Sequence, residues 1–256
     1  MLGAAGVAAV SWLDDRRPLP ALLRLAVHAA CAGLVVGAFL ATGGIPAASG
    51  LPRTILAAAA LLWMVGLTNA YNFMDGIDGM AATQAVVAGA AWCLLGWWHG
   101  GAGLALLGAL LAATSLGFLG HNWAPARVYM GDVGSTFLGY SFAALALWGA
   151  AADWRLLVAG VLFVWPFVWD TGLTLLCRAW RRENILAAHR SHLYQRLVIA
   201  GASHTRVTGL YALLALAGVA CGLLICVAPD AWGAGPGLVL VLGSALWLGV
   251  RRRERR

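Results

Sequence analysis

The sequence contains no lysine and few negative charges: all 17 basic residues are arginines, and only ten of the 256 residues are aspartate or glutamate. Charged residues make up 11% of the chain and hydrophobic residues 62%, with a mean hydropathy of +0.82. A soluble domain is about half apolar and about a quarter charged. The composition therefore excludes an ordinary soluble domain and indicates an integral membrane protein.

Two further classes are excluded by what is missing. The five cysteines all lie in apolar segments and show no CxxC spacing, which favours packing over disulfides or metal sites. The arginines form no basic domain interleaved with aromatic residues, so nucleic acid is not expected as a partner. Without a soluble domain or a long linker, residues 1–256 are interpreted as one membrane domain.

Apolar runs of about 20 residues, the length that crosses a ~30 Å hydrocarbon core, recur along the chain. They predict an all-α, polytopic transmembrane helix bundle of about nine segments. The first segment, 1–11, would rise only about 16 Å as a helix, about half of a bilayer. The eight full spans are expected at 22–41, 54–71, 81–97, 102–120, 135–151, 156–177, 207–228 and 235–250.

Arginine is distributed unevenly between the two sides of such a bundle. One side carries 15 of the 17 arginines, and the other carries only Arg53 and Arg155. Because cytoplasmic loops are enriched in basic residues, the arginine-rich side and the C-terminus are predicted to be cytoplasmic. The net charge of +7 then reflects topology and attraction to anionic headgroups.

A polar stripe follows one of the apolar runs, in NAYNFMDGIDG at 69–79. Asn69, Asn72, Asp75 and Asp78 are spaced by three, so they would share one face if the stretch is helical. Such residues can bind neighbouring helices together. Two carboxylates this close to hydrocarbon are costly for that purpose, which favours a functional site.

Three other polar motifs lie on the same side: Asp14 and Asp15 in SWLDDRRPLP, Asp132 in VYMGDVGSTFLG, and His189 with His192 in HRSHLYQRL. Each alone could be a solvated loop, a turn or an interfacial pair. Together they suit a metal and phosphates, because Mg²⁺ prefers hard oxygen ligands and arginine or histidine neutralises phosphate. Clustered carboxylates also repel one another unless a cation lies between them.

Asp170, in FVWDTGLTLLCR, lies inside an expected span. An acid at such a position is functional by default, and a local hydrogen bond or a pair with Arg178 is an equally open interpretation. His28 and His121 are interpreted as structural.

The motifs NAYNFMDGIDGMA, NWAPARVYMGDVGSTFLG and DDRRPLP, in this order and on one side, resemble the signatures of the polyprenyl-phosphate N-acetylhexosamine-1-phosphate transferases, glycosyl transferase family 4. The first motif is the most specific, and the resemblance covers residues 10–200. It implies a multi-pass enzyme of the bacterial inner membrane. Such an enzyme moves a sugar-1-phosphate from a UDP-sugar to undecaprenyl phosphate and releases UMP, with Mg²⁺ or Mn²⁺ as cofactor.

The resemblance also implies the roles of the residues. Asn72 and Asp132 would hold the metal, and Asp14, Asp15 and Asp75 are the catalytic candidates, with Asp14 deprotonating or positioning the lipid phosphate. Tyr129 would stack on uracil. The substrate-binding candidates are Asn69, Gly76, Asp78, Asn122, Tyr129, His189, His192 and Arg196. Direct attack by the lipid phosphate is favoured over a covalent intermediate on an aspartate.

The HRSHLYQRL loop resembles the branch that starts O-antigen or capsule synthesis. That branch implies a UDP-N-acetyl-6-deoxyhexosamine donor of the fucosamine or quinovosamine type, with UDP-N-acetylglucosamine or the muramoyl-pentapeptide as alternatives. The chain departs from the family in two ways. One or two N-terminal spans of the family are expected to be missing, and Arg17 or Arg24 would substitute for a lysine near the first motif.

Two other classes remain as alternatives. A transporter would place acids near the bilayer midplane between broken helices, whereas five acids here gather at one rim, which favours the enzyme. An inactive lipid-phosphate-binding homologue is the other alternative. The expected partners are undecaprenyl phosphate, a UDP-N-acetylhexosamine and the lipid bilayer, with a homodimer as an open alternative for the assembly.

Overall fold

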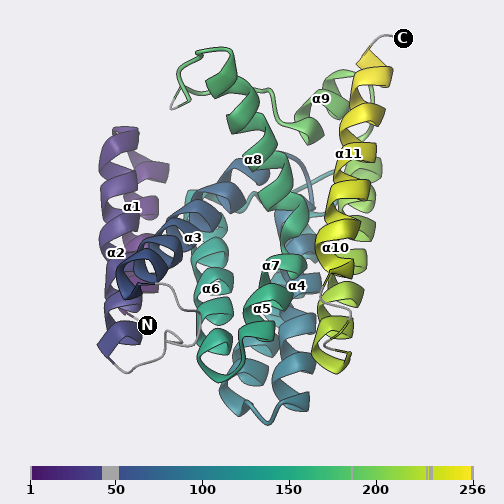
Figure 1. Cartoon of the computed structure of the whole chain (residues 1–256). Coiled ribbons are helices and arrows are strands. Elements are labelled where there is room, and N and C mark those ends of the chain that lie inside the picture. The colour runs from purple at the N-terminus through teal and green to yellow at the C-terminus, as the bar shows by residue number, and fades with distance from the viewer. Residues whose placement is uncertain (1, 42–51, 186, 229, 231–232, 255–256) are drawn as a thin grey trace.

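The computed structural model describes residues 2–41, 52–185, 187–228, 230 and 233–254. The expected loop at 42–53 lies mostly outside these ranges, and Arg255 and Arg256 lie wholly outside them. Within the described ranges every regular element is a helix (Figure 1). The helices are α1 (Leu2–Arg16), α2 (Ala21–Ala41), α3 (Arg53–Met74), α4 (Met80–Trp98), α5 (Ala102–Asn122), α6 (Gly131–Ala152), α7 (Trp154–Phe163), α8 (Trp165–Trp180), α9 (Leu193–Ile199), α10 (His204–Val227) and α11 (Ala234–Glu254).

The all-α, multi-span prediction is confirmed. Among the described residues, six helices are long and apolar enough to cross a membrane, namely α2, α3, α4, α5, α6 and α10. They match six of the eight expected spans. The helix α11 covers the last expected span but is not one of the six, and α1 has 15 residues. The expected count of about nine segments is therefore not confirmed.

The prediction of one continuous span at 156–177 is wrong. Helices α7 and α8 meet at Val164 with a bend of 73° between them, so this segment is a broken span or a re-entrant element. Pro166 lies in the first turn of α8, where its missing N–H costs nothing, whereas inside a continuous helix it would remove a hydrogen bond.

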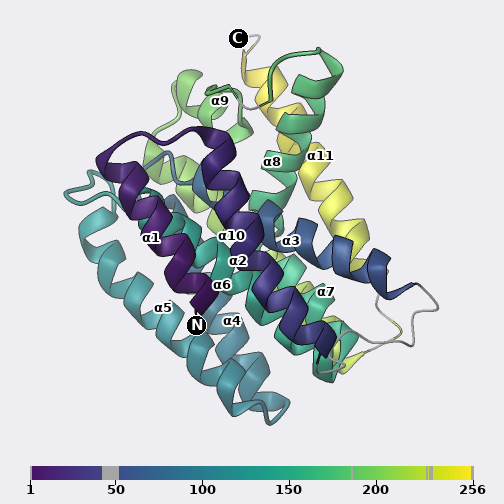
Figure 2. The same cartoon turned by 90° about the vertical axis from the view of Figure 1, so that its left-hand side faces the viewer.

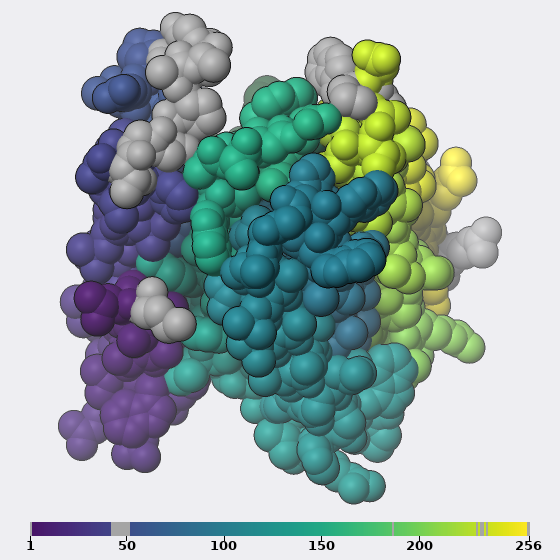
Figure 3. All heavy atoms as spheres, turned by 90° about the horizontal axis from the view of Figure 1, so that it is seen from below, coloured from purple at the N-terminus to yellow at the C-terminus, as the bar shows by residue number. Residues whose placement is uncertain are grey.

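The loops that connect the helices lie at two opposite ends of the bundle (Figures 1 and 2). The α4–α5 turn and the junction between α6 and α7 lie at one end. At that junction Asp153 pairs with Arg155 at 2.5 Å. The ends of α8 and α11 and the short helix α9 lie at the other end. From below, Figure 3 shows α1 and α2 as a column beside the α4–α5 pair. The polar motifs are therefore gathered at the end opposite Arg155.

Close packing of α3 on α6 brings the second and third motifs together. A Cβ on Gly139 of α6 would lie 2.7 Å from the carbonyl oxygen of Leu67 on α3, so only glycine allows this approach. The α1 helix joins the same pair through a buried hydrogen bond of 2.8 Å between the hydroxyls of Ser11 and Thr136. These contacts place the first three motifs around the start of α6.

Candidate active site

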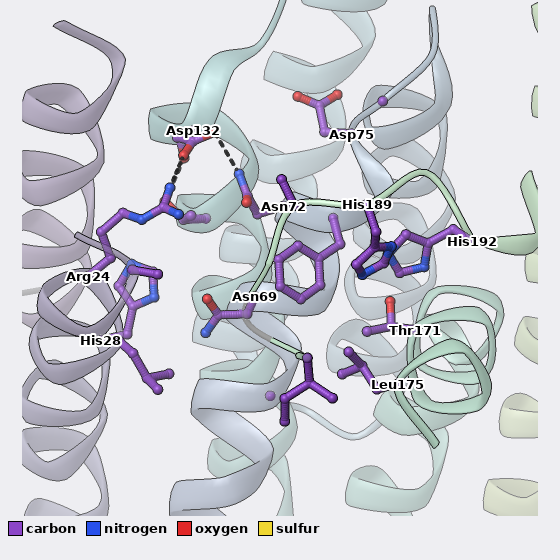
Figure 4. A pocket seen from close by; sticks show the side chains of 18 of the residues that line it. Arg24, His28, Asn69, Asn72, Asp75, Asp132, Thr171, Leu175, His189 and His192 are labelled. Carbon is purple, nitrogen blue, oxygen red and sulfur yellow. Dashed lines mark hydrogen bonds and ion pairs between the residues drawn. The ribbon is translucent and has the colours of Figure 1, made fainter. Parts of the chain in front are cut away.

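A cavity of about 520 Å³ opens among α2, α3, α6, α8 and the segment before α9 (Figure 4). Polar side chains of the second, third and fourth motifs line it. Its apolar wall includes Leu25, Leu62, Val65 and Leu175. The cavity therefore offers polar groups and a hydrocarbon-like surface side by side. Its polar lining includes Arg24, His28, Asn69, Asn72, Asp75, Asp132, His189 and His192.

Arg24 connects the first motif to the third. Its Nη1 donates to Asp132 Oδ2 at 3.0 Å and also contacts Asp14 Oδ2. The other oxygen of Asp14 accepts the backbone N–H of Leu19 at 2.6 Å. Burial raises the pKa of Asp14, but the Leu19 N–H and the Arg24 charge outweigh it, and the pKa lies below its usual value. Asp14 is therefore an ionised anchor for Arg24.

Asp15 holds the first turn of α6. Its two oxygens accept the backbone N–H groups of Asp132 at 3.0 Å and Val133 at 3.2 Å, satisfying N–H groups that a helix start leaves unpaired. Gly131 has φ of +68°, and a Cβ there would lie 2.8 Å from Asp15 Oδ2. Asp14 and Asp15 lie beside the cavity and are not part of its lining. In this structure Asp15 fixes the position of Asp132.

The polar stripe is shorter than the spacing predicts. Helix α3 ends at Met74, so Asn69, Asn72 and Asp75 line the cavity while Asp78 does not. Asn72 Nδ2 donates to Asp132 Oδ1 at 2.8 Å and to Ser135 Oγ at 3.0 Å (Figure 4). The shared face at 69–78 was expected only if the helix continued, and it does not.

Asp75 is the cavity carboxyl with the largest change in acidity. Burial, together with the charges of Asp132 and Asp15, raises its pKa to about 7. Asp14 and Asp132 both contact the guanidinium group of Arg24, whereas Asp75 has no arginine among the groups that shift its pKa. Burial first, and then the negative charges of Asp132 and Asp15, favour the protonated form of Asp75 near neutral pH.

Asp78 and Asn122 hold the segment between α5 and α6. Asp78 Oδ2 accepts the Ala126 N–H at 3.1 Å and lies 3.3 Å from His204 Nδ1. Asn122 is 4% exposed; it accepts from the Gly79 N–H at 3.0 Å and donates to the Val128 carbonyl at 2.9 Å. Tyr129 follows with 76% of its surface exposed. The ring of Tyr129 is accessible to a ligand.

The histidine loop is anchored by Asp170, which is fully buried. Asp170 accepts the N–H groups of Leu193 at 2.8 Å and Tyr194 at 3.1 Å, and the Tyr211 hydroxyl at 2.5 Å. His192 Nδ1 lies 3.3 Å from the same carboxylate. Arg178 is not among these partners. Thr174 supplies a local hydrogen bond of 3.2 Å, while the other hydrogen-bond partners lie 23 or more residues away along the chain.

His189 and His192 both line the cavity, with ring centroids 4.9 Å apart. Burial, and the charges of His192 and Arg178, lower the pKa of His189, so its ring is neutral over a wider pH range. Arg196 lies elsewhere: it pairs with Glu254 through two hydrogen bonds of 2.6 Å and is not in the cavity lining.

Comparison with known proteins agrees with the motifs. The profile of glycosyl transferase family 4 matches residues 1–150. The chain belongs to this family. It is 31% identical over 209 residues to a probable undecaprenyl-phosphate N-acetylglucosaminyl 1-phosphate transferase of Bacillus subtilis, covering 79% of this chain and 58% of that protein.

Two further relatives of this family 4 chain are similar at the same level. A phospho-N-acetylmuramoyl-pentapeptide-transferase of Limosilactobacillus fermentum is 32% identical, over 61% of this chain and 48% of the relative. A decaprenyl-phosphate N-acetylglucosaminephosphotransferase of Mycobacterium tuberculosis is 30% identical, over 81% and 58%. The chain spans about half the length of these curated relatives.

The donor set of this family 4 chain fits a hard divalent cation only in part. Among the described residues, no three acidic, histidine or cysteine side chains are grouped closely enough to hold a metal. Asp132 and the Asn72 carboxamide could supply two oxygen ligands beside excess negative charge. Mg²⁺ is typically held by one or two protein carboxylates, with water and substrate phosphate completing its shell. The pair therefore suits a metal that arrives with a phosphate.

Three cavity residues were missed or undervalued in the family 4 sequence. The sequence suggests Arg24 only as a lysine substitute and His28 only as a structural residue, yet both line the cavity. Their spacing of four on one face of α2 was the signal available. The Tyr194 hydroxyl approaches Gly76 so closely that a Cβ there would lie 2.0 Å from it. That contact requires a glycine at position 76, which also lines the cavity.

Proposed function

We propose that this chain transfers a sugar-1-phosphate from a UDP-N-acetylhexosamine to undecaprenyl phosphate and releases UMP. The observation that carries the proposal is the contact of Arg24 and Asn72 with Asp132, in a cavity whose other wall is apolar. A charged nucleotide sugar and a lipid phosphate need this combination of surfaces. The names of the curated relatives support the same reaction class.

In the proposed reaction, an oxygen of the lipid phosphate attacks the phosphorus attached to the sugar. A new P–O bond forms, the P–O bond to the uridine phosphate breaks, and UMP leaves with the electron pair. Asp75, whose pKa is about 7, is the group suited to accept the proton of the lipid phosphate. Arg24 would neutralise phosphate charge, and Asp14, with its lowered pKa, would hold Arg24 in place.

Asn72 and Asp132 would hold Mg²⁺ or Mn²⁺. When bound, the ion would neutralise charge on the diphosphate as the bond breaks. Direct transfer is preferred over a covalent aspartyl intermediate, because Asp132 already contacts Arg24 and Asn72 and Asp15 accepts two backbone N–H groups. Asp14 is likewise engaged with Arg24.

The sugar would be recognised by His189 and His192, which line the cavity beside Phe73. A 6-deoxy N-acetylhexosamine is one candidate, and the pathway would then be O-antigen or capsule synthesis. N-acetylglucosamine is the other candidate, since two of the similar relatives are named for it. The nucleoside would lie near Gly76, Asp78, Asn122 and Tyr129.

The site would face the cytoplasm of a bacterial inner membrane, because the arginine-rich end of the chain carries the cavity. A transporter is less well supported, since the acids gather at the helix ends near Arg24 and not along the middle of the bundle. An inactive homologue would need a lost acid, whereas Asp14, Asp15, Asp75 and Asp132 are all present.

The test is UMP release by the purified protein with undecaprenyl phosphate and Mg²⁺, across a panel of UDP-sugars. We expect lipid-dependent UMP from one donor, and its loss in Asp132→Asn while the variant still folds. Thr114→Val is a matched control, since Thr114 hydrogen-bonds only the backbone of α5, away from the cavity. Absence of lipid-dependent UMP with every donor, or full activity in Asp132→Asn, would contradict the proposal.

A further inference from the structure

A second cavity lies on the far side of α8 and α9 from the active-site candidate. It measures about 420 Å³ and opens between α8, α9 and α11. The two cavities use opposite faces of the same helices. Thr171, Leu175 and His192 line the first, whereas Leu173, Thr174 and Leu193 line the second. The second cavity is therefore a separate site.

Four arginines line this cavity: Arg178, Arg181, Arg196 and Arg251. Glu254 is the acid in its lining, and it forms two hydrogen bonds with Arg196. Glu183 pairs from outside, 3.0 Å from Arg178 and 3.9 Å from Arg181. Among the residues that the structure describes, two carboxylates form ion pairs with arginines of this cavity, so its lining carries more positive than negative charge.

Arg178 is the most deeply buried of the four arginines. Its side chain is about nine-tenths buried, and its terminal nitrogens reach Glu183 and the Asn184 carbonyl. Within the part of the chain that the structure describes, no acceptor lies against its buried Nε–H. A buried donor without a partner is costly. Guanidinium groups match phosphate geometry, so the arginines that line the cavity suit a phosphate.

An apolar groove continues from the basic cavity along the same helices. It measures about 300 Å³ and lies between α7, α8 and α11. Leu173 lines both spaces, so the two are adjacent. The remaining groove residues are apolar: Val161, Leu162, Trp165, Val168, Trp169, Gly172, Leu176 and Val239. A charged recess at the helix ends, followed by an apolar groove along the span, matches a lipid.

We propose that the second cavity and the adjoining apolar groove bind a membrane lipid with an anionic phosphate head. The phosphate would lie among Arg178, Arg181 and Arg251, and one hydrocarbon chain would follow Leu173 and Gly172 down the groove. Arg251 already lies over the Trp247 ring at 4.8 Å, an arrangement suited to the headgroup level. Basic recesses between membrane helices are recognised lipid sites.

The experiment measures how much of each added probe the delipidated protein retains in neutral detergent. Four probes are added separately: phosphatidylglycerol, phosphatidylcholine with the same chains, undecaprenyl phosphate, and inorganic phosphate. We expect phosphatidylglycerol or undecaprenyl phosphate to be retained at least tenfold better than phosphatidylcholine. Retention of phosphatidylglycerol supports the site. Undecaprenyl phosphate is expected to bind at the candidate active site as well, so its retention supports the second cavity only where the variants of that cavity lower it.

The double variant Arg181→Gln with Arg251→Gln should lower that retention about tenfold, because it removes two arginines of the cavity. Both side chains are exposed enough that the melting temperature should not change. The control is Arg206→Gln with Arg252→Gln, which removes the same charge from exposed arginines that do not line the cavity. Gly172→Leu should lower retention independently, since the space beside Gly172 is open and leucine would fill the groove.

Three results would overturn the assignment. Equal losses in the two double variants would mean attraction by overall charge. Equal retention of phosphatidylcholine would mean that the anionic head is not recognised. Binding of inorganic phosphate but of no lipid, at a level that Gly172→Leu does not change, would mean that the ligand is a soluble anion.

Discussion

Asp14 and Asp15 are neighbours in the sequence, yet their carboxylates have different partners. Asp14 engages Arg24, whereas Asp15 accepts two N–H groups at the start of α6. The sequence predicts that the acids gather, because their motifs follow spans on one side. It does not predict which acid faces the cavity, since that depends on where α3 stops and on Gly131. Single residues are thus predictable as a cluster, and their individual contacts are not.

The raised pKa of Asp75 leads to a prediction on stability. Its folded pKa of about 7 lies above the ordinary 3.8, so folding disfavours the charged form and wild-type stability falls as pH rises from about 4 to 7. At pH 8 the melting temperature of Asp75→Asn should therefore be several degrees above that of the wild type. At pH 4 the two melting temperatures should be the same. Thermal unfolding in metal-free detergent solution measures this difference.

Magnesium supplies the control for Asp75. A cation near Asp132 would compensate the negative charge, so saturating Mg²⁺ should shrink the difference between Asp75→Asn and wild type at pH 8. A difference that does not vary with pH would show that the variant acts through packing and not through ionisation.

Tyr129 gives a prediction on substrate affinity. Its ring is 76% exposed, so its removal should leave the fold intact. Stacking of a base on an aromatic ring contributes about 1–3 kcal/mol, so Tyr129→Ala should raise the KM for the UDP-sugar by about tenfold with little change in kcat. Steady-state UMP release measures both constants. Tyr129→Phe should keep the wild-type KM, and an unchanged KM in Tyr129→Ala would remove Tyr129 from the nucleoside site.

At the scale of elements, α9 has seven residues and owes its position to Asp170. A helix this short is not stable alone. The Asp170 carboxylate accepts the N–H groups of the first two residues of α9, Leu193 and Tyr194. It also accepts the hydroxyl of Tyr211 on α10. The sequence marks Asp170 as unusual, because an acid inside a span is costly. The sequence alone does not identify its partners, which come from a loop and a distant helix.

Asp170→Asn should therefore disturb the histidine loop. An asparagine presents one acceptor and one NH₂ group where two acceptors are needed, and each lost hydrogen bond to a charged group costs about 1.5–3 kcal/mol. We expect kcat to fall by about tenfold to a hundredfold. Hydrogen exchange at residues 189–199 should increase in parallel. Thr174→Val, which removes only the 3.2 Å contact to Asp170, is the control. Lower activity with unchanged exchange would contradict the positioning role.

The break between α7 and α8 shows where sequence patterns stop being informative. The stretch from 156 to 177 is apolar apart from Asp170 and two threonines, so hydropathy predicts one span, while Pro166 is a visible signal of an interruption. A proline in a membrane helix can either bend it or begin a new one. Only the packing of Trp165 and Phe163 in the core decides between these, and hydropathy carries no information on that packing.

At the scale of the whole molecule, the two-sided distribution of arginine was the most informative sequence feature. It groups the four motifs at one end of the bundle, and the structure places Asp153 and Arg155 at the other. The orientation of the bundle in the bilayer is a prediction from charge, because each arginine at the wrong side would have to cross the membrane during insertion. Orientation is therefore open to a direct test.

Single cysteines in a cysteine-free background would report the orientation. His99, in the α4–α5 turn, and Thr205, at the start of α10, are both exposed and lie at opposite ends. We expect a membrane-impermeant maleimide to label His99→Cys in intact spheroplasts and Thr205→Cys only in inside-out vesicles. The reverse pattern would put the candidate active site outside the cell, where no UDP-sugar is supplied, and would contradict the proposed transfer reaction along with the topology.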